Sequence, residues 1–119
     1  MTVITAVTCF SLMNIKLSDG AVRVRVVRAE LEALISSRAV NLDLELPRNH
    51  VFRLNVRPAV IGGWKLESDP TGIWISIPRT ELEALSQSLP SRDGLEHFFE
   101  LASGRKIEVS FEVDIREST

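Results

Sequence analysis

A five-residue stretch occurs twice in this chain and restricts the architecture that the rest can adopt. Glu-Leu-Glu-Ala-Leu stands at residues 30–34 and again at residues 81–85. Each copy follows a strand-like alternation of apolar side chains, at residues 22–26 and 73–77, so strand and helix recur with the same offset. An identity in register with the preceding pattern indicates an internal duplication.

The first half opens with a predicted hairpin. Residues 15–17 and 22–26 alternate apolar and polar side chains, as half-buried strands do. The Asp-Gly pair between them favours the positive φ angles of a tight turn. Pairing Leu17 with Val22 keeps the apolar side chains of both strands on one face.

A short helix is expected from Ala29 to about Ser37. Leu31, Leu34 and Ile35 fall on one side of it, at the spacing of an amphipathic helix.

A second hairpin follows this helix. Residues 40–47 and 51–57 alternate again, and a three-residue loop at 48–50 would join them. This register places Glu45 opposite Arg53, which is a favourable cross-strand pair.

The second half repeats this plan after a joint at residues 58–63, whose proline and glycines interrupt any regular element. Its helix begins either with Pro78 in the first turn or with Thr80 as the cap. Residues 95–101 and 106–115 form the last hairpin.

The expected fold is α+β. Two ββαββ repeats form one curved, mostly antiparallel sheet or a half-barrel, with two short helices packed on it. Residues 1–119 are one domain, with units at 13–57 and 64–115. Residues 1–12 are either an extension or an extra strand.

Composition narrows the class of protein. The 119 residues are 45% hydrophobic and 25% charged, with a net charge of −2, so no overall positive field attracts nucleic acid. The only cysteine, Cys9, forms no internal disulfide, which favours a reducing, cytoplasmic setting. No apolar run approaches the roughly 20 residues that span a bilayer.

The stretch from Met13 reads Met-Asn-Ile-Lys-Leu, a turn, Val-Arg-Val-Arg-Val, and then Arg-Ala-Glu-Leu to Leu31. It resembles a family of small bacterial domains of unknown function that open with Met-Lys-Ile-Arg, followed by an Arg-Leu-Arg-Leu strand and a Ser-Glu helix. The resemblance covers mainly the first third, and Val27 stands where the family has a capping threonine. It implies a small cytoplasmic bacterial domain and no particular activity.

No residues form a recognisable catalytic set. His50 falls in a predicted loop and His97 on an apolar strand face beside Phe99, in different halves of the chain. Cys9 has no basic neighbour that would activate its thiol. We therefore predict no catalytic residue, no metal site and no cofactor.

One enzymatic alternative rests on acidic residues in the predicted strands. A curved barrel lined by acids and arginines could hold phosphorylated substrates. The acidic candidates are Asp43, Glu45, Glu100, Glu108, Glu112 and Asp114.

The leading hypothesis is a non-catalytic module that binds a protein partner, a ligand or a second copy of itself through a sheet face or edge. The candidate binding residues are Arg23, Arg25, Arg53, Arg57 and Trp74, all of which alternation places on the polar faces. An outward Trp74 would be either covered by residues 1–12 or part of a contact surface. Weak binding of nucleic acid through the arginines is a further, less favoured alternative.

Overall fold

The computed structural model describes residues 12–89 and 94–114, and these contain eight strands and two helices. Both halves have the order ββαββ that the sequence predicts. The elements of the first half are β1 (Asn14–Ser18), β2 (Ala21–Val26), α2 (Arg28–Ile35), β3 (Val40–Leu46) and β4 (His50–Ala59). Those of the second half are β5 (Lys65–Asp69), β6 (Gly72–Pro78), α3 (Arg79–Ser88), β7 (Leu95–Glu100) and β8 (Lys106–Val113).

The strands divide between two four-stranded sheets, where the sequence suggested one curved sheet or a half-barrel. Sheet A has the order β1-β2-β8-β7 and sheet B the order β3-β4-β6-β5. Each sheet joins the first hairpin of one half to the last hairpin of the other. The central pairs, β2 with β8 and β4 with β6, are parallel, and the four hairpin pairs are antiparallel.

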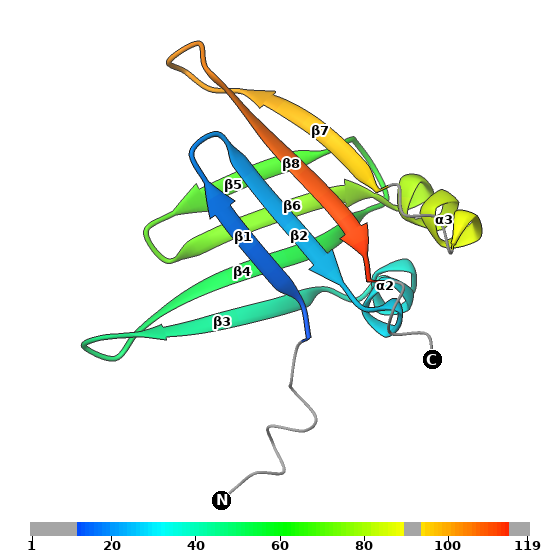
Figure 1. Cartoon of the computed structure of the whole chain (residues 1–119), viewed down its shortest axis with the longest axis horizontal. Coiled ribbons are helices and arrows are strands. Elements are labelled where there is room, and N and C mark those ends of the chain that lie inside the picture. Colours follow the sequence, from blue (N-terminus) through cyan, green and yellow to red (C-terminus); the bar gives the residue numbers. More distant parts are fainter. Residues whose placement is uncertain (1–11, 90–93, 115–119) are drawn as a thin grey trace, which may run out of the picture.

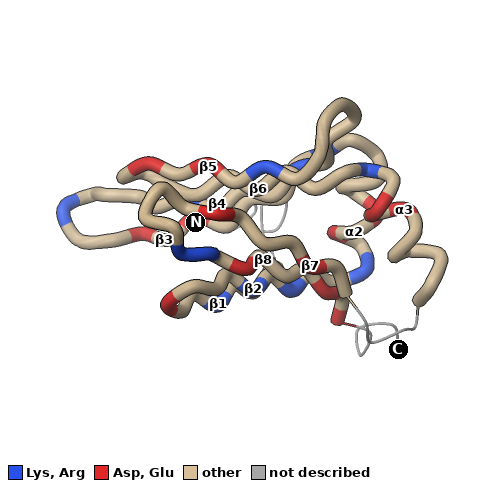
Figure 2. Tube along the Cα trace, turned by 90° about the horizontal axis from the view of Figure 1, so that it is seen from above, with Lys and Arg blue, Asp and Glu red and all other residues tan. Residues whose placement is uncertain are grey.

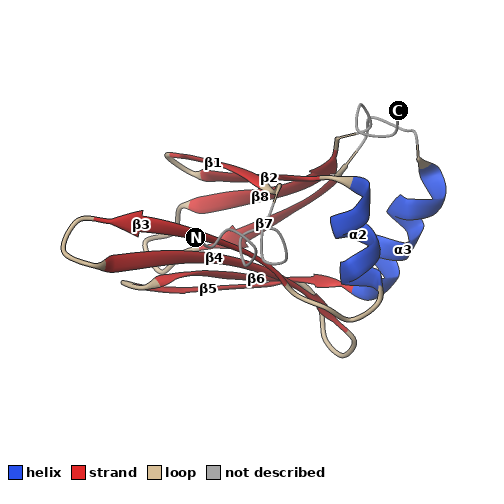
Figure 3. Ribbon diagram, turned by 90° about the horizontal axis from the view of Figure 1, so that it is seen from below, coloured by secondary structure: helices blue, strands red, loops and turns tan. Residues whose placement is uncertain are grey.

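The two sheets form separate layers, and the helices close one end between them (Figure 1 and Figure 3). A single open sheet would leave much of its apolar face in water. Two facing sheets instead bury the apolar inner face of each sheet. Each helix turns the chain out of one layer and into the other, so β3 cannot continue beside β2. The sheets are consequently not closed into a barrel.

The core lies between the inner faces of the sheets and the two helices. Among the described residues, none of the buried ones is polar or charged. The fully buried side chains include Val24, Val26, Leu31, Leu34, Val56, Ile75, Ile77, Leu82, Val109 and Phe111. They come from both halves in matching places, so the halves share one core.

Glu30 fixes the start of α2 and joins it to β1. Val27, the N-cap residue, has no polar side-chain atom, so it cannot satisfy the first helical N–H groups itself. Oε1 of Glu30 accepts a hydrogen bond of 3.0 Å from the backbone N–H of Val27. Its Oε2 accepts bonds of 2.9 Å and 3.1 Å from the backbone N–H groups of Leu12 and Met13. One carboxylate thus holds the helix cap and the start of β1 together.

The second helix starts in a way that neither expected register described. Pro78 ends β6 and is itself the N-cap residue, with φ −55° and ψ 131°, so α3 begins at Arg79. Glu81, which corresponds to Glu30, accepts a 3.1 Å hydrogen bond from the indole Nε1–H of Trp64. In both halves this glutamate therefore anchors the chain just before a first strand.

The register of the β1–β2 hairpin agrees with the sequence-based prediction, whereas that of the β3–β4 hairpin differs from it. Leu17 pairs with Val22, as predicted. In the second hairpin, Asp43 rather than Glu45 lies opposite Arg53. Arg48 and Asn49 adopt positive φ angles of 68° and 58°, so the turn starts one residue earlier than expected and His50 joins β4.

The joint between the halves is shorter than the expected residues 58–63. Pro58 and Ala59 continue β4 and pair with the end of β6. Val60 and Ile61, directly after β4, are 73% and 92% exposed.

Candidate interaction surfaces

The arginines and the tryptophan that alternation singled out lie on two different surfaces. Arg23 and Arg25 are on the outer face of sheet A, through β2. Arg53, Arg57 and Trp74 are on the outer face of sheet B, through β4 and β6. The sandwich separates these faces, so the five residues do not form one strip. Figure 2 shows positive and negative positions on both layers.

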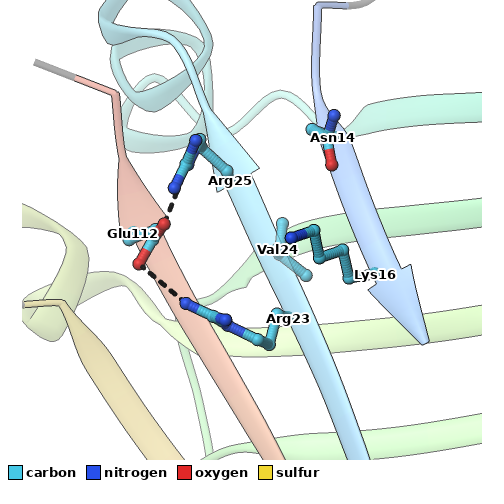
Figure 4. A pocket seen from close by; sticks show the side chains of 6 residues that line it. All are labelled: Asn14, Lys16, Arg23, Val24, Arg25 and Glu112. Carbon is cyan, nitrogen blue, oxygen red and sulfur yellow. Dashed lines mark hydrogen bonds and ion pairs between the residues drawn. The ribbon is translucent and has the colours of Figure 1, made fainter. Parts of the chain in front are cut away.

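On sheet A, a shallow depression surrounds the two arginines of β2. It is lined by Asn14, Lys16, Arg23, Val24, Arg25 and Glu112 (Figure 4). The Nε of Arg25 lies 2.8 Å from Oε2 of Glu112, and Nη2 of Arg23 lies 3.9 Å from Oε1. The acidic last strand therefore compensates part of the positive charge of β2.

On sheet B, Arg53 and Asp43 form a two-point ion pair across the β3–β4 hairpin. The Nε and Nη2 of Arg53 donate hydrogen bonds of 2.8 Å and 3.0 Å to the two oxygens of Asp43. These bonds hold the pKa of the Asp43 carboxyl below its usual value. The side chains are 50% and 45% exposed, so the pair contributes little to stability.

Removing the Arg53 guanidinium should therefore return Asp43 to ordinary titration. In Arg53→Gln, we expect the pKa of Asp43 to rise towards the usual value of an aspartate carboxyl, measured by NMR of its carboxyl carbon. Because the folded-state pKa of Asp43 is the lower one, its stabilising effect is present above the unfolded pKa and is lost as pH falls through the folded pKa. The variant and the wild type should thus converge in stability in acid.

Asp69 is the internal control for this titration. Its pKa is also lowered, but by hydrogen bonds from the side chain and backbone of Thr71 rather than by an arginine. It should titrate identically in both proteins. An Asp43 pKa that stays low in Arg53→Gln would contradict the assigned cause.

Trp74 lies on the outer face, opposite to the buried Ile75, as alternation predicted. Its ladder neighbours are Asn55 and Glu67. It lines an open depression together with Arg57, Glu67, Ser68 and Asp69. The predicted cover from residues 1–12 falls, apart from Leu12, outside the described residues.

The acidic residues of the enzymatic alternative do not converge either. Glu112 pairs with arginines on sheet A, and Asp43 pairs with Arg53 on sheet B. Within the part of the chain that the structure describes, no group of three metal-ligating side chains occurs. The buried interior between the sheets is apolar.

Both histidines lie away from these groups. His50 is exposed at the start of β4. His97 stacks on Trp64, with ring centroids 5.2 Å apart, and meets the edge of Phe99 at 4.8 Å. Its expected place beside Phe99 on an apolar face is confirmed. Cys9 lies outside the described residues.

One surface was not foreseen from the sequence. The β3–β4 hairpin extends beyond the edge of sheet A (lower left in Figure 1), so no strand or helix of the described residues covers its inner face there. Leu44 and Leu46 there are 51% and 38% exposed, beside the partly buried Leu42 and Phe52. We call these four residues the β3–β4 overhang. Alternation places their side chains on the apolar face of the hairpin, but it does not show that sheet A ends before it reaches them.

The matching hairpin of sheet A, β7–β8, has aromatic neighbours at one of the two corresponding positions. The two hairpins can be aligned on equivalent residue pairs. Val40 of β3 pairs with Val56 of β4, and Leu95 of β7 pairs with Phe111 of β8, where β4 and β8 are the strands that form the central parallel pairs. In this alignment Val40 is equivalent to Leu95. Leu44 is therefore equivalent to Phe99, and Leu46 to Leu101. The stacked rings of Trp64 and His97 pack beside Phe99, whereas the place of Trp64 in the first half belongs to Met13.

Comparison of the chain with models of known protein families, with curated proteins and with solved structures finds no match. Neither helix in the described part is long and apolar enough to cross a membrane.

Proposed function

We propose that the chain is a non-catalytic protein-interaction domain that binds an extended, apolar peptide segment along β3. The observation that carries this is the half-exposed pair Leu44 and Leu46 on a strand at the edge of its sheet. An edge strand presents unpaired backbone N–H and C=O groups, and an added strand satisfies them. Alternate side chains of that strand would then meet the leucines of the overhang.

The arginine-bearing outer faces and the apolar interior fit the alternative functions less well. The arginines of sheet A are engaged by Glu112, and Arg53 is engaged by Asp43. Nucleic-acid binding usually relies on a continuous basic patch, and opposite faces divide the available arginines. An acid-lined catalytic interior is likewise disfavoured, because the residues buried between the sheets are apolar.

The test uses a fluorescein-labelled peptide of alternating valine and threonine with the length of β3, 7 residues. We expect saturable binding in fluorescence anisotropy. Leu46→Asp should weaken it about tenfold or more, because burying one leucine contributes about 1.5–3 kcal/mol.

Leu101→Asp is the matched control, because Leu101 is the corresponding residue of the other hairpin and is 43% exposed. Its affinity for the peptide should equal that of the wild type. Equal losses of affinity in Leu46→Asp and Leu101→Asp would contradict a site on β3.

We also propose that the two halves arose by duplication within a cytoplasmic bacterial domain. The matched roles of Glu30 and Glu81 support the duplication, and a single cysteine supports the reducing compartment. The bacterial origin rests on the resemblance of residues 13–31. Related sequences in which the two glutamates vary independently would argue against the duplication, and recovery from a membrane or secreted fraction against the location.

A further inference from the structure

We infer that the outer face of sheet A is a dimer interface, on which a second copy of this chain packs through the same face. Charge identifies the occupant, because one half of this face is basic and the other half is acidic. The surface is separate from the β3–β4 overhang, so the inference goes beyond the proposed function and does not depend on it.

The basic half consists of β1 and β2. Lys16, Arg23 and Arg25 are exposed on the outer face of these strands (Figure 4). Neither strand contains an aspartate or a glutamate. This half of the face therefore carries positive charge only.

The acidic half consists of β8 and β7, the other two strands of the sheet. Its outward residues include Glu96 and Glu100 on β7, and Glu108 and Glu112 on β8. Lys106, at the start of β8, is the only lysine or arginine in these two strands, and it lies opposite Glu100. The boundary between the two halves is the parallel pair of β2 and β8.

Only the charges at this boundary are paired within one copy. Glu112 lies 2.8 Å from Nε of Arg25 and 3.9 Å from Nη2 of Arg23. Among the described side chains, no ion pair engages Lys16, Glu96 or Glu108. Charges on both halves are therefore available to a second copy.

The distribution of charge selects one symmetry for the dimer. A two-fold axis parallel to the strands, between β2 and β8, lays the basic half of each copy over the acidic half of the other. A two-fold axis across the strands would instead stack each half on itself, and so like charge on like charge. With the first axis, the strands of the two copies stay roughly aligned, as in face-to-face packing of sheets. Two-fold pairs are also the commonest form of self-association.

The ladder registers identify the side chains that then meet. One row across the sheet contains Lys16, Arg23, Ser110 and Glu96, in this order. The axis reverses the row in the second copy, so Lys16 of each copy lies over Glu96 of the other. Two equivalent charge pairs result, one on each side of the axis.

Phe98 adds an apolar contact to these charge pairs. It is 58% exposed on the outer face, beside Glu108 in the ladder, so the fold of one copy does not bury it. Its row continues through Ala21 to Ser18, and the same axis places Phe98 over Ser18 of the second copy. The small side chains of Ser18 and Ala21 leave room for the ring, and aromatic residues are enriched at protein interfaces.

The area of the face predicts a weak dimer. Four strands about 4.8 Å apart and six residues long make a face of roughly 400 Å² per copy. A standard interface buries about 800 Å² per partner, so this dimer belongs with the weak, transient interfaces.

The first test is sedimentation equilibrium of the full 119-residue chain over a concentration series, at low and at high salt. We expect a monomer–dimer equilibrium whose Kd rises at least about tenfold at high salt, because screening weakens the charge pairs of the interface. A chain that stays monomeric at low salt, or a dimer that salt does not weaken, would overturn the inference.

A charge-exchange experiment tests the geometry. Lys16→Glu/Arg23→Glu makes both halves of the face acidic, and Glu96→Lys/Glu108→Lys makes both halves basic. Each variant alone should lose the dimer, and an equimolar mixture should regain it as a heterodimer. A mixture that stays monomeric, while circular dichroism shows both variants folded, would overturn the inference.

The wild type still decides the question if either variant fails to fold. On dilution, the amide NMR signals that shift should belong to β1, β2, β7 and β8. Shifts confined to sheet B would overturn the inference.

Glu45→Lys/Glu67→Lys is the matched control for Glu96→Lys/Glu108→Lys, because it changes the net charge equally but on the outer face of sheet B. It should form a homodimer with the wild-type affinity and no heterodimer with Lys16→Glu/Arg23→Glu. If the control paired with that variant as tightly as Glu96→Lys/Glu108→Lys does, net charge rather than sheet A would drive association, and the inference would fail.

Leu46→Asp separates this interface from the β3–β4 overhang. It should leave the dimer intact and weaken only the binding of the valine–threonine peptide. Loss of the dimer in Leu46→Asp would assign self-association to the overhang and overturn the inference. Peptide binding by a chain that never dimerises contradicts this inference alone, whereas a salt-sensitive dimer that binds no peptide contradicts the proposed function alone.

Discussion

Replacing Leu31 or Leu82 by alanine is expected to lower the free energy of unfolding by about 2–5 kcal/mol in each case. Both side chains are 0% exposed and occupy matching places on α2 and α3. Each substitution leaves a cavity where a helix packs on the two sheets. Because the halves share one core, either loss should weaken the whole domain in a single transition. Urea denaturation followed by circular dichroism measures it.

Glu32→Ala is the control for this pair, because Glu32 is exposed on the same helix as Leu31. It should change the free energy of unfolding by less than about 0.5 kcal/mol. A near-neutral result at Leu31 or Leu82, or two separate transitions, would contradict the shared core.

Gly72→Ala is expected to destabilise the protein by about 1–3 kcal/mol or more, through crowding rather than through a cavity. A Cβ at this position would lie 2.2 Å from the backbone carbonyl oxygen of Arg53. That oxygen belongs to the neighbouring strand β4, so it cannot move without disturbing the parallel ladder. Thermal unfolding of the variant provides the measurement.

Gly63→Ala serves as the comparison. A Cβ added at Gly63 would meet no atom within 4 Å, and the residue has no positive φ angle, so alanine there should be neutral or slightly stabilising. The contact with Arg53 would be refuted if both variants melted at the wild-type temperature. Ala21, in the corresponding place of the first half, already carries a Cβ, so the restriction at Gly72 belongs to the β4–β6 pair.

Local features of the fold were predictable because their causes are local. The Asp-Gly turn and the alternation around it determine the pairing of Leu17 with Val22. The spacing of Leu31 and Leu34 identifies the buried side of α2. The turn at Arg48 and Asn49 was misplaced by one residue, because non-glycine residues adopt positive φ too seldom to be expected there.

The division into two sheets could not be read from the sequence. Alternation shows which side chains share a face, but not which distant strand lies alongside. The pairing of β2 with β8 brings Arg25 to Glu112, 87 positions away, and no turn signal records it.

The same limit applies to the candidate surfaces. Alternation predicted correctly that Arg23, Arg53 and Trp74 point outwards, but not that the two sheets would separate Arg23 from the other two. It also put Leu44 and Leu46 on the apolar face of their hairpin, without showing that this face is half exposed. Their exposure follows from the position of the β3–β4 hairpin beyond sheet A, which is a property of the whole fold.

The exchange of hairpins between the halves has a consequence for how the chain folds as it is made. β8 lies between β2 and β7, so sheet A stays in two pieces until β8 has been synthesised. Until then β2 keeps one unpaired edge and apolar Val24 has no neighbour at Phe111. Closing so long a loop costs chain entropy before its ladder bonds form, which makes this step slow. During synthesis, β2 is therefore open to wrong pairing with other strands until β8 binds to it.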